Sequence, residues 1–290
     1  MAPFPSPTST WHTTAYATIS PIRPELSAVG KTVIITGGGT GIGAETARSF
    51  AEAGASRIAL LGRREQPLLH TKASIESKFP GVEIFVASTD VTKKSEVDAA
   101  FANFIGRGRV DVVVSNAGAM GPSESVEDAE EHKFLGAIQK SIQGSLFVAQ
   151  AFLRHAAANA VAINVCSSAA HLNFAPGFAA YSIAKLATFR LWDSVAFAHP
   201  ELSVFHTQPG VVDTDMNKEI GGVAALGQED HVSLPANFHV WLASPEARFL
   251  KGKFLWANWD VDELKARAKE LESSTQLSVG LVGWPFENSM

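Results

Sequence analysis

The sequence predicts an α/β protein, a single domain in which a doubly wound sheet of about seven parallel strands forms the middle of three layers. From residue 31 onward, short apolar or β-branched runs alternate with stretches of helical length. The gaps between the runs are long enough for the crossovers of about a dozen residues that parallel strands need. With 290 residues, 46% of them hydrophobic, the chain can bury one large core.

Each expected element has a local reason. The strand candidates contain apolar runs such as VII, ALL, IFV and VVV, most of which are rich in the β-branched or aromatic residues that favour strands. They cover residues 31–37, 57–62, 82–88, 111–115, 160–166, 202–207 and 252–256. The amphipathic stretches between them predict helices over 43–53, 65–78, 94–106, 124–155 with a break, 178–198 and 235–243.

Three segments depart from this alternation. Residues 1–30 form an N-terminal extension, and its first 24 residues are proline-rich, so we expect them to be extended or partly disordered. Residues 214–234 are weakly periodic and contain paired glycines, which predicts a mobile lid after a strand end. Beyond the domain at 31–257, the C-terminal extension 258–290 contains a predicted helix over 260–273 with Asp260 as its N-cap.

Composition and charge narrow the class of protein. The net charge of -5 argues against a nucleic-acid partner. The single cysteine, Cys166, cannot form a disulfide within the chain, and the chain has no Asn-x-Ser/Thr sequon. The start of the chain lacks the features of a signal peptide, and no window approaches the roughly 20 apolar residues of a membrane helix. We therefore expect a cytoplasmic protein without a membrane partner.

A glycine-rich loop directly follows the first predicted strand and opens an alanine-rich helix. Glycines there let the backbone turn tightly and approach a pyrophosphate, whose charge the free N–H groups at the helix start would stabilise. Taken alone, the run could also be a purely structural glycine turn. The candidate cofactor residues of the loop are Thr36, Gly37, Gly39, Thr40, Gly41, Ile42 and Gly43.

The spacing of these glycines, G-x-x-x-G-x-G, resembles the TGxxxGxG loop of the short-chain dehydrogenase/reductase family. Further motifs follow in the order of that family. They are Asp90-Val91 (similar to its adenine contact), Asn116-Ala117-Gly118 (its NAG motif), Ser168 with Tyr181 and Lys185 (its catalytic Ser and YxxxK), and Pro209-Gly210 with Thr214 (its PG turn and nicotinamide contact). The resemblance covers about residues 31–257.

This resemblance implies a Rossmann-like fold, a nicotinamide cofactor and a homodimer or homotetramer. The two extensions resemble those of fungal members of the family. The end of the second strand bears on the choice of cofactor, because an acidic side chain there would bond the ribose hydroxyl and repel a 2′-phosphate. Gly62 takes that place, and Arg63 and Arg64 follow, so NADP(H) is favoured over NAD(H). The alternative is that one or both arginines are ordinary solvated surface.

Tyr181 and Lys185 are four residues apart on a predicted helix, so they share a face. Tyrosine is a poor base at neutral pH, and a neighbouring ammonium favours the phenolate. By resemblance, Ser168 would donate a hydrogen bond to the substrate oxygen, Tyr181 would exchange a proton with it, and Lys185 would tune Tyr181 and bind the ribose. The adjacent Ser167 is the alternative for the serine, although strand alternation would point the two to opposite sides.

One residue departs from the family's pattern. Where the family has the Asn of an N-x-x-G motif, which holds a helix kink and a water of the proton relay, this chain has Ser141. Serine could still hold a water, but with a shorter reach and one donor fewer. We include Ser141 among the candidate catalytic residues.

The segment between Ser168 and Tyr181 predicts an apolar substrate wall, which would suit a cyclic or aromatic carbonyl compound. The candidates for this wall are Met120, His171, Leu172, Phe174 and Phe178, with ordinary loop packing as the alternative. No histidine has the spacing of a metal ligand, so no metal is expected.

These observations together predict an NADP(H)-dependent oxidoreductase that interconverts a ketone and a secondary alcohol by hydride transfer. Two other functions stay open. One is a regulatory protein that binds NADP(H) without turnover, and the other is a redox-neutral enzyme such as an epimerase.

Overall fold

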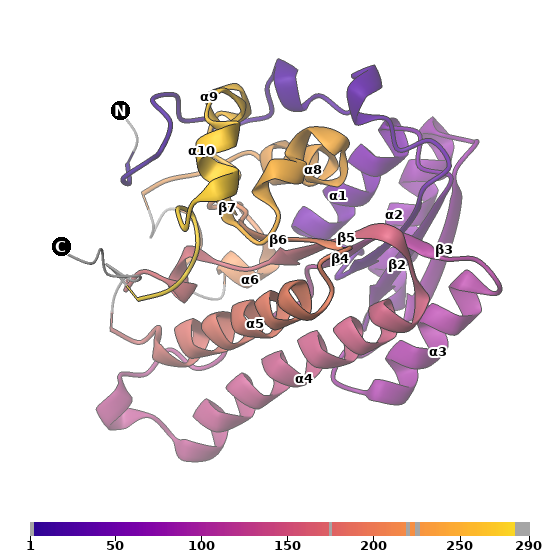
Figure 1. Cartoon of the computed structure of the whole chain (residues 1–290). Helices are drawn as coiled ribbons and strands as arrows, with labels where there is room; N and C mark the ends of the chain where they lie inside the picture. Colours follow the sequence, from indigo (N-terminus) through magenta and orange to yellow (C-terminus); the bar gives the residue numbers. More distant parts are fainter. Residues whose placement is uncertain (1–2, 174–175, 219–220, 224–226, 282–290) are drawn as a thin grey trace.

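A seven-stranded parallel sheet forms the centre of the chain, seen here in a computed structural model (Figure 1). The structure describes residues 3–173, 176–218, 221–223 and 227–281. The strand order is β3-β2-β1-β4-β5-β6-β7, so the winding direction reverses between β1 and β4. The predicted α/β class, with a doubly wound Rossmann-like sheet, is confirmed.

Each predicted strand lies within a few residues of its expected place. The strands are β1 (Thr32–Thr36), β2 (Arg57–Gly62), β3 (Glu83–Ser88), β4 (Val110–Ser115), β5 (Ala156–Val165), β6 (Ser203–Gln208) and β7 (Phe254–Trp256). In the middle of the sheet, Ile34 of β1 pairs with Ala59 of β2 on one side and with Val113 of β4 on the other. The runs VII of β1 and VVV of β4 are therefore buried in the middle of the sheet, whereas IFV of β3 lies at its edge and is only partly buried.

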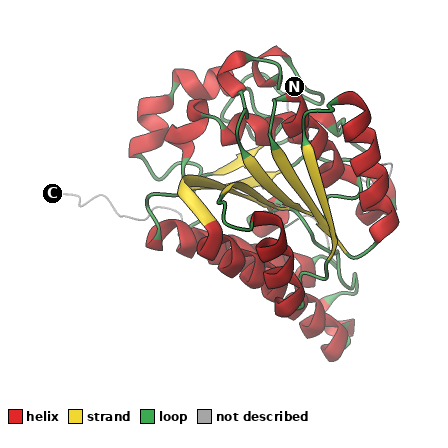
Figure 2. Ribbon diagram, turned by 90° about the vertical axis from the view of Figure 1, so that its right-hand side faces the viewer, coloured by secondary structure: helices red, strands yellow, loops and turns green. Residues whose placement is uncertain are grey.

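Helices cover both faces of the sheet (Figure 2). One face packs against α1 (Gly41–Glu52), α2 (Glu65–Lys78) and α8 (Ser233–Ala243), and the other against α3 (Lys94–Ile105), α4 (Glu131–His155) and α5 (Ala179–Ala198). Large apolar side chains fill both interfaces; examples are Phe50, Phe238, Phe101, Phe152 and Trp192. Among the described residues, no helix is both long and apolar enough to cross a membrane.

The predicted helix over 124–155 is a short 3-10 turn, η3 (Val126–Asp128), followed by α4, so the expected break lies at residues 129–130. The strand predicted over 160–166 begins four residues earlier, directly after α4. Its first residues are alanines, which carry no strand signal of their own. The pairing of β4 with β5 is irregular there, and Asn159 has a φ of +60°.

The N-terminal extension is folded, so the expectation of an extended or partly disordered segment is wrong for residues 3–24. It forms η1 (Ala17–Ile19) and η2 (Pro24–Leu26) and runs beside the C-terminal helices α9 (Val261–Ala266) and α10 (Ala268–Ser273) (Figure 1). Trp11 pairs with Trp259 in an antiparallel bridge, and the carboxylate of Glu263 accepts the backbone N–H groups of Ser9 and Thr10 at 2.6 and 2.9 Å. The two extensions therefore complete one core.

The C-terminal helix has the predicted N-cap, because Asp260 accepts the backbone N–H of Glu263 at 2.9 Å. It is two helices rather than one, since the regular structure is interrupted at Arg267. The predicted lid over 214–234 contains α6 (Asp215–Lys218) and runs into the start of α8. Parts of this segment, residues 219–220 and 224–226, lie outside the described residues.

Candidate active site

The glycine loop lies between β1 and α1, at the point where the strand order reverses. Ligands of open α/β sheets bind at such a switch point, beyond the carboxyl ends of the strands. A Cβ on Gly43 would overlap the carbonyl oxygen of Gly37, so glycine at this position lets the helix pack closely on the loop. Thr40, the N-cap of α1, makes no side-chain cap hydrogen bond, which leaves N–H groups at the helix start for an anion.

Thr36 and Asn116 hold the glycine loop against the end of β4. The hydroxyl oxygen of Thr36 accepts the backbone N–H groups of Asn116 and Ala117 at 2.9 and 3.0 Å. In return, the side-chain amide of Asn116 donates to the carbonyl oxygen of Thr36 at 2.9 Å. These bonds fix the relative position of two loops that the sequence separates by 80 residues.

A cleft of about 960 Å³ runs across the carboxyl edge of the sheet from this loop. Most of the predicted cofactor residues line it, from the loops after β1, β2, β3, β4 and β6 and from helix α5. They are Gly37, Gly39, Thr40, Gly41, Ile42, Gly62, Arg63, Arg64, Asp90, Val91, Asn116, Ala117, Gly118, Tyr181, Lys185, Pro209 and Thr214. Three predicted cofactor residues are not among those that line the cleft. They are Thr36, Gly43 and Gly210, which support the loops instead.

Arginines and a carboxylate meet at one end of the cleft. Arg63 and Arg64 follow β2, and Asp90 follows β3. Hydrogen bonds from the backbone and hydroxyl of Thr92 lower the pKa of Asp90, so this carboxylate is ionised near neutral pH. Arg64 forms an ion pair with Asp215 of α6 at 3.2 Å between Nη2 and Oδ2. This ion pair joins the loop after β2 to α6.

Tyr181 and Lys185 line the same cleft from α5. The ammonium nitrogen of Lys185 lies 5.6 Å from the centre of the Tyr181 ring and donates to the carbonyl oxygen of Val165 at 3.0 Å. Val165 is the last residue of β5, so the strand end fixes the lysine. The helical spacing thus brings both side chains to the cleft, as the sequence predicted.

The serine of the predicted catalytic group does not lie on the cleft. Ser168 begins the short turn η4 (Ser168–Ala170), is 2% exposed and donates its backbone N–H to the side-chain oxygen of Gln208 at 2.7 Å. The strand ends at Val165, so the alternation of a strand does not extend to this serine. Ser167 is only half-buried, and its hydroxyl caps η4 by accepting the N–H of Ala169 at 3.2 Å. Neither serine is among the residues that line the cleft, so Ser168 stays the candidate that the resemblance selects and Ser167 stays its alternative.

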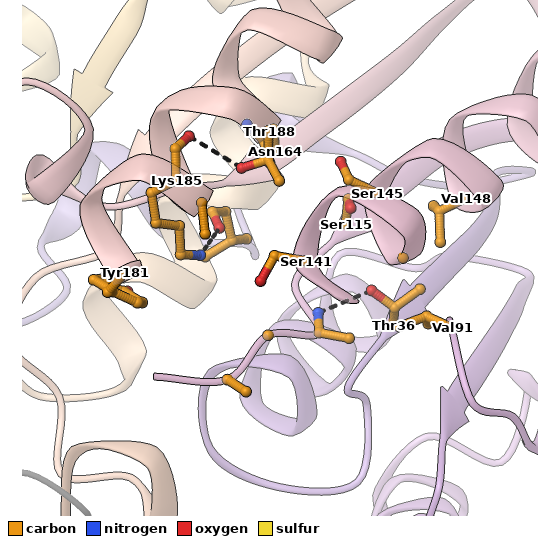
Figure 3. Close-up of a pocket in the computed structure, with 16 residues that line it drawn as sticks. Thr36, Val91, Ser115, Ser141, Ser145, Val148, Asn164, Tyr181, Lys185 and Thr188 are labelled. Carbon is orange, nitrogen blue, oxygen red and sulfur yellow. Dashed lines mark hydrogen bonds between the residues drawn. The ribbon is translucent and has the colours of Figure 1, made fainter. Parts of the chain in front are cut away.

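Ser141 lines the cleft from α4, on the side opposite Tyr181 and Lys185 (Figure 3). Its hydroxyl donates to the carbonyl oxygen of Ala137 at 3.0 Å. A hydroxyl has one hydrogen, so in this arrangement Ser141 can only accept a further hydrogen bond.

The expected substrate wall is largely elsewhere. Met120 lines the cleft. His171, by contrast, packs edge-on against Phe254 and accepts a 3.3 Å hydrogen bond from the indole N–H of Trp256, and Leu172 packs against the core. Phe178 is the residue before α5 and does not line the described cleft, while Phe174 lies outside the described residues. The turn η4 carries His171 and Leu172 under β7, away from the cleft.

Asp230 supports the site and was not found from the sequence. It is 1% exposed, and its carboxylate accepts the N–H of Val211 at 2.7 Å and the amide of Asn258 at 2.9 Å. A Cβ on Gly210, whose φ is +92°, would lie 2.7 Å from this carboxylate. Burial raises the pKa of Asp230, whereas these hydrogen bonds oppose that shift. No signal in the sequence distinguishes Asp230 from its polar neighbours.

The family model described as short chain dehydrogenase matches residues 31–222. The chain belongs to the short-chain dehydrogenase family. Among curated relatives, the short chain dehydrogenase/reductase AacuD of Aspergillus aculeatus is 34% identical over 285 residues, which cover 96% of this chain and 98% of the relative. A short chain dehydrogenase/reductase of Claviceps purpurea is 32% identical over 283 residues, covering 96% and 95%.

Solved structures share the fold of this short-chain dehydrogenase. A short chain dehydrogenase from Burkholderia cenocepacia in complex with NADP superposes with a TM-score of 0.72 at 24% identity, covering 79% of this chain and 96% of that one. Levodione reductase gives a TM-score of 0.72 at 20% identity, with the same coverage. As a member of this family, the chain is an oxidoreductase. The two curated relatives named above are fungal, in agreement with the resemblance to fungal members.

Proposed function

We propose that this short-chain dehydrogenase is an NADP(H)-dependent enzyme that interconverts a ketone and a secondary alcohol. The observation that carries the proposal is that Tyr181 and Lys185 line the same cleft as the glycine loop. When bound, the nicotinamide cofactor supplies or accepts the hydride. The free N–H groups at the start of α1 fit its pyrophosphate.

The protein's own residues handle the proton. In the reductive direction, the hydroxyl of Tyr181 donates its proton to the carbonyl oxygen of the substrate as that oxygen becomes an alcohol. The ammonium of Lys185, held by the carbonyl of Val165, stabilises the phenolate that remains. Ser168, by resemblance, donates a hydrogen bond to the same oxygen; Ser167, whose hydroxyl accepts the N–H of Ala169 in η4, is the alternative.

The charges around β2 support NADP(H) over NAD(H). Gly62 leaves no carboxylate to repel a 2′-phosphate, and the two arginines that follow line the cleft. The fold relative from Burkholderia cenocepacia is itself in complex with NADP.

Apolar side chains support a substrate with an apolar body. Met120 and Pro122 follow the NAG motif, Met216 lies on α6, and all three line the cleft. We infer a cyclic or aromatic ketone as the substrate class, now with Met120 and Met216 as the wall in place of His171 and Leu172.

We also propose a homo-oligomer in the cytoplasm. Leu146 on α4 and Ile183 and Leu186 on α5 are between 36% and 46% exposed, and a second copy would cover them. The lone thiol of Cys166 is buried, which suits a compartment where disulfides are rare.

The test is a panel of cyclic and aromatic ketones with NADPH and with NADH, followed by the loss of cofactor absorbance. Tyr181→Phe should bind NADPH like the parent and lose turnover by about a hundredfold or more, because only the proton donor is removed. Cofactor binding with no turnover of any ketone by the parent would instead point to the regulatory alternative. Product formation without net cofactor consumption would point to a redox-neutral enzyme.

A further inference from the structure

The N-terminal extension is bonded to the loop after β7 through its backbone at residues 12–13. His12 and Asn258 exchange two hydrogen bonds. The N–H of His12 donates to the carbonyl oxygen of Asn258 at 2.8 Å, and the side-chain amide of Asn258 donates to the carbonyl oxygen of His12 at 2.9 Å. The carbonyl oxygen of Thr13 accepts the N–H of His231 at 2.7 Å. The extension therefore holds the chain on both sides of the C-terminal edge of β7.

Asn258 connects this contact to the buried carboxylate of Asp230. Its side-chain amide donates to Oδ1 of Asp230 at 2.9 Å, and both residues are 1% exposed. The other oxygen, Oδ2, accepts the N–H of Val211 at 2.7 Å and the side-chain amide of Gln228 at 3.3 Å. A buried carboxylate is costly unless hydrogen bonds compensate it, and an ionised carboxylate can only accept. These three donors therefore fix where the carboxylate lies.

Asp230 in turn holds a turn that belongs to the cofactor cleft. It bonds Val211 twice, because its own N–H donates to the carbonyl oxygen of Val211 at 2.7 Å. The preceding residue, Gly210, passes so close that a Cβ there would lie 2.7 Å from the carboxylate. Pro209, one residue earlier, lines the cleft. The position of the carboxylate thus sets the position of the cleft wall at this turn.

Three residues beyond this turn, Thr214 packs on the glycine loop. A Cβ on Gly41 would lie 3.0 Å from Cγ2 of Thr214. Oγ1 of Thr214 accepts the N–H of Asn217 at 3.2 Å, and the side-chain amide of Asn217 donates to the carbonyl oxygen of Val212 at 3.2 Å. These bonds join Thr214 to the segment that begins at Val211, so a shift of Val211 also shifts Thr214.

We propose that the N-terminal extension takes part in the active site: through Asn258 and Asp230 it fixes the turn that leads to Thr214, the nicotinamide contact that the resemblance implies. This inference rests on the proposed function for the role of Thr214. Asp230 is a positioning residue in this arrangement, since it is buried behind the turn and is not among the residues that line the cleft.

The network acts on one end of the cleft. Val211 follows β6, and Asn258 follows β7. Arg63 and Asp90, which bear on the adenosine end of the cofactor, follow β2 and β3, on the other side of β1 and β4 in the sheet. A displaced turn should therefore weaken the contacts to the nicotinamide and leave those to the adenosine unchanged. A general loss of stability would not distinguish the two ends.

The test compares the Kd for NADPH with the Kd for 2′-phospho-ADP-ribose, which lacks the nicotinamide. In Asp230→Asn an amide replaces the carboxylate, and its NH₂ group must face one of the donors. We expect the Kd for NADPH to rise about fivefold, the effect of about one hydrogen bond, and the Kd for 2′-phospho-ADP-ribose to stay as in the parent. The kcat for ketone reduction should fall by about tenfold or more, because the nicotinamide is displaced from the substrate.

Two milder variants test the link to the extension. Asn258→Ala removes the side-chain bonds to His12 and Asp230 but leaves the bond between Asp230 and Val211 in place. His12→Pro removes the N–H that donates to the carbonyl oxygen of Asn258. Both should raise the Kd for NADPH by less than Asp230→Asn does, again without a change for 2′-phospho-ADP-ribose. They carry the test if Asp230→Asn does not fold.

The matched control is Glu246→Gln, which also turns a carboxylate into an amide and loosens the extension elsewhere, at the 2.8 Å ion pair with Arg23. It should lower the Tm and leave both Kd values and kcat as in the parent. Folded Asp230→Asn and Asn258→Ala variants with the parental Kd for NADPH overturn the proposal, and so does an equal rise in both Kd values. A parent that binds NADPH but reduces no ketone overturns the proposed function alone, because both Kd values are measured without turnover.

Discussion

The ion pair between Arg64 and Asp215 gives a quantitative test of the cofactor assignment. Arg64 follows β2, where a 2′-phosphate would lie, and Asp215 is the first residue of α6. Binding of a phosphate by Arg64 must compete with this carboxylate or share the guanidinium with it. We therefore expect Asp215→Asn to tighten the binding of NADP(H) and to leave the binding of NAD(H) unchanged.

The size of the effect follows from distance and exposure. Two unit charges 3.2 Å apart attract by about 1.3 kcal/mol in bulk water. Both side chains are 65% exposed, and ion pairs of that kind contribute about 1 kcal/mol or less. Release of Arg64 should therefore lower the Kd for NADP(H) by at most about fivefold, and the gain should shrink at high salt.

The assay is titration calorimetry of the parent and the variant with NADP and with NAD. Asp213→Asn is the matched control, because it removes the same charge from the same loop and breaks the exposed 3.7 Å ion pair with Lys218. In the background of Arg64→Ala, the Asp215 substitution should have no effect. An equal gain in NADP affinity in Asp213→Asn would show that the effect comes from the change in net charge and not from the release of Arg64. Weaker NADP binding by Asp215→Asn would refute the reasoning, because it would mean that the ion pair itself supports the bound cofactor.

Three further outcomes are expected. Gly62→Asp combined with Arg63→Ala should shift the preference, measured as the ratio of the Kd values for NADP(H) and NAD(H), toward NAD(H). A Cβ on Gly62 meets only Leu68, at an ordinary 3.4 Å, so the new side chain fits. An unchanged ratio would contradict the assignment of NADP(H). Ser168→Ala should reduce kcat more than Ser167→Ala, as the resemblance implies, and a larger loss in Ser167→Ala would assign the role to this half-buried serine instead. Burial lowers the pKa of His206 and His239 to about 3, so unfolding takes up two protons below pH 6.5. The free energy of unfolding, measured with urea, should fall by about 4 kcal/mol between pH 7 and pH 5, and a flat profile would contradict this.

Local patterns were sufficient to predict the sheet and most of the cleft. The strands are short branched runs, and each loop that lines the cleft follows a strand at the same edge, so Arg63, Asp90 and Asn116 come together once the order of the sheet is known. The position of Tyr181 and Lys185 depends only on the pitch of one helix. Such features need no knowledge of contacts between distant parts of the chain.

Features that depend on distant contacts could not be predicted in this way. The resemblance selects Ser168, but the strand ends at Val165, so the turn η4 and not strand alternation sets how Ser167 and Ser168 are exposed. His171 follows in the chain, yet its partner Trp256 comes 85 residues later.

The N-terminal extension shows the same limit most clearly. Its prolines and short polar residues carry no helical or strand periodicity, which is why they predict an extended or partly disordered chain. The segment is ordered because its partners come from the other end of the molecule: Glu263 accepts two of its backbone N–H groups, and Trp11 packs edge-on against Trp256 at 5.8 Å between ring centres. Trp256 also donates to His171, so the same indole joins the extension to the loop that follows β5. The order of this extension therefore depends on β7 and α9.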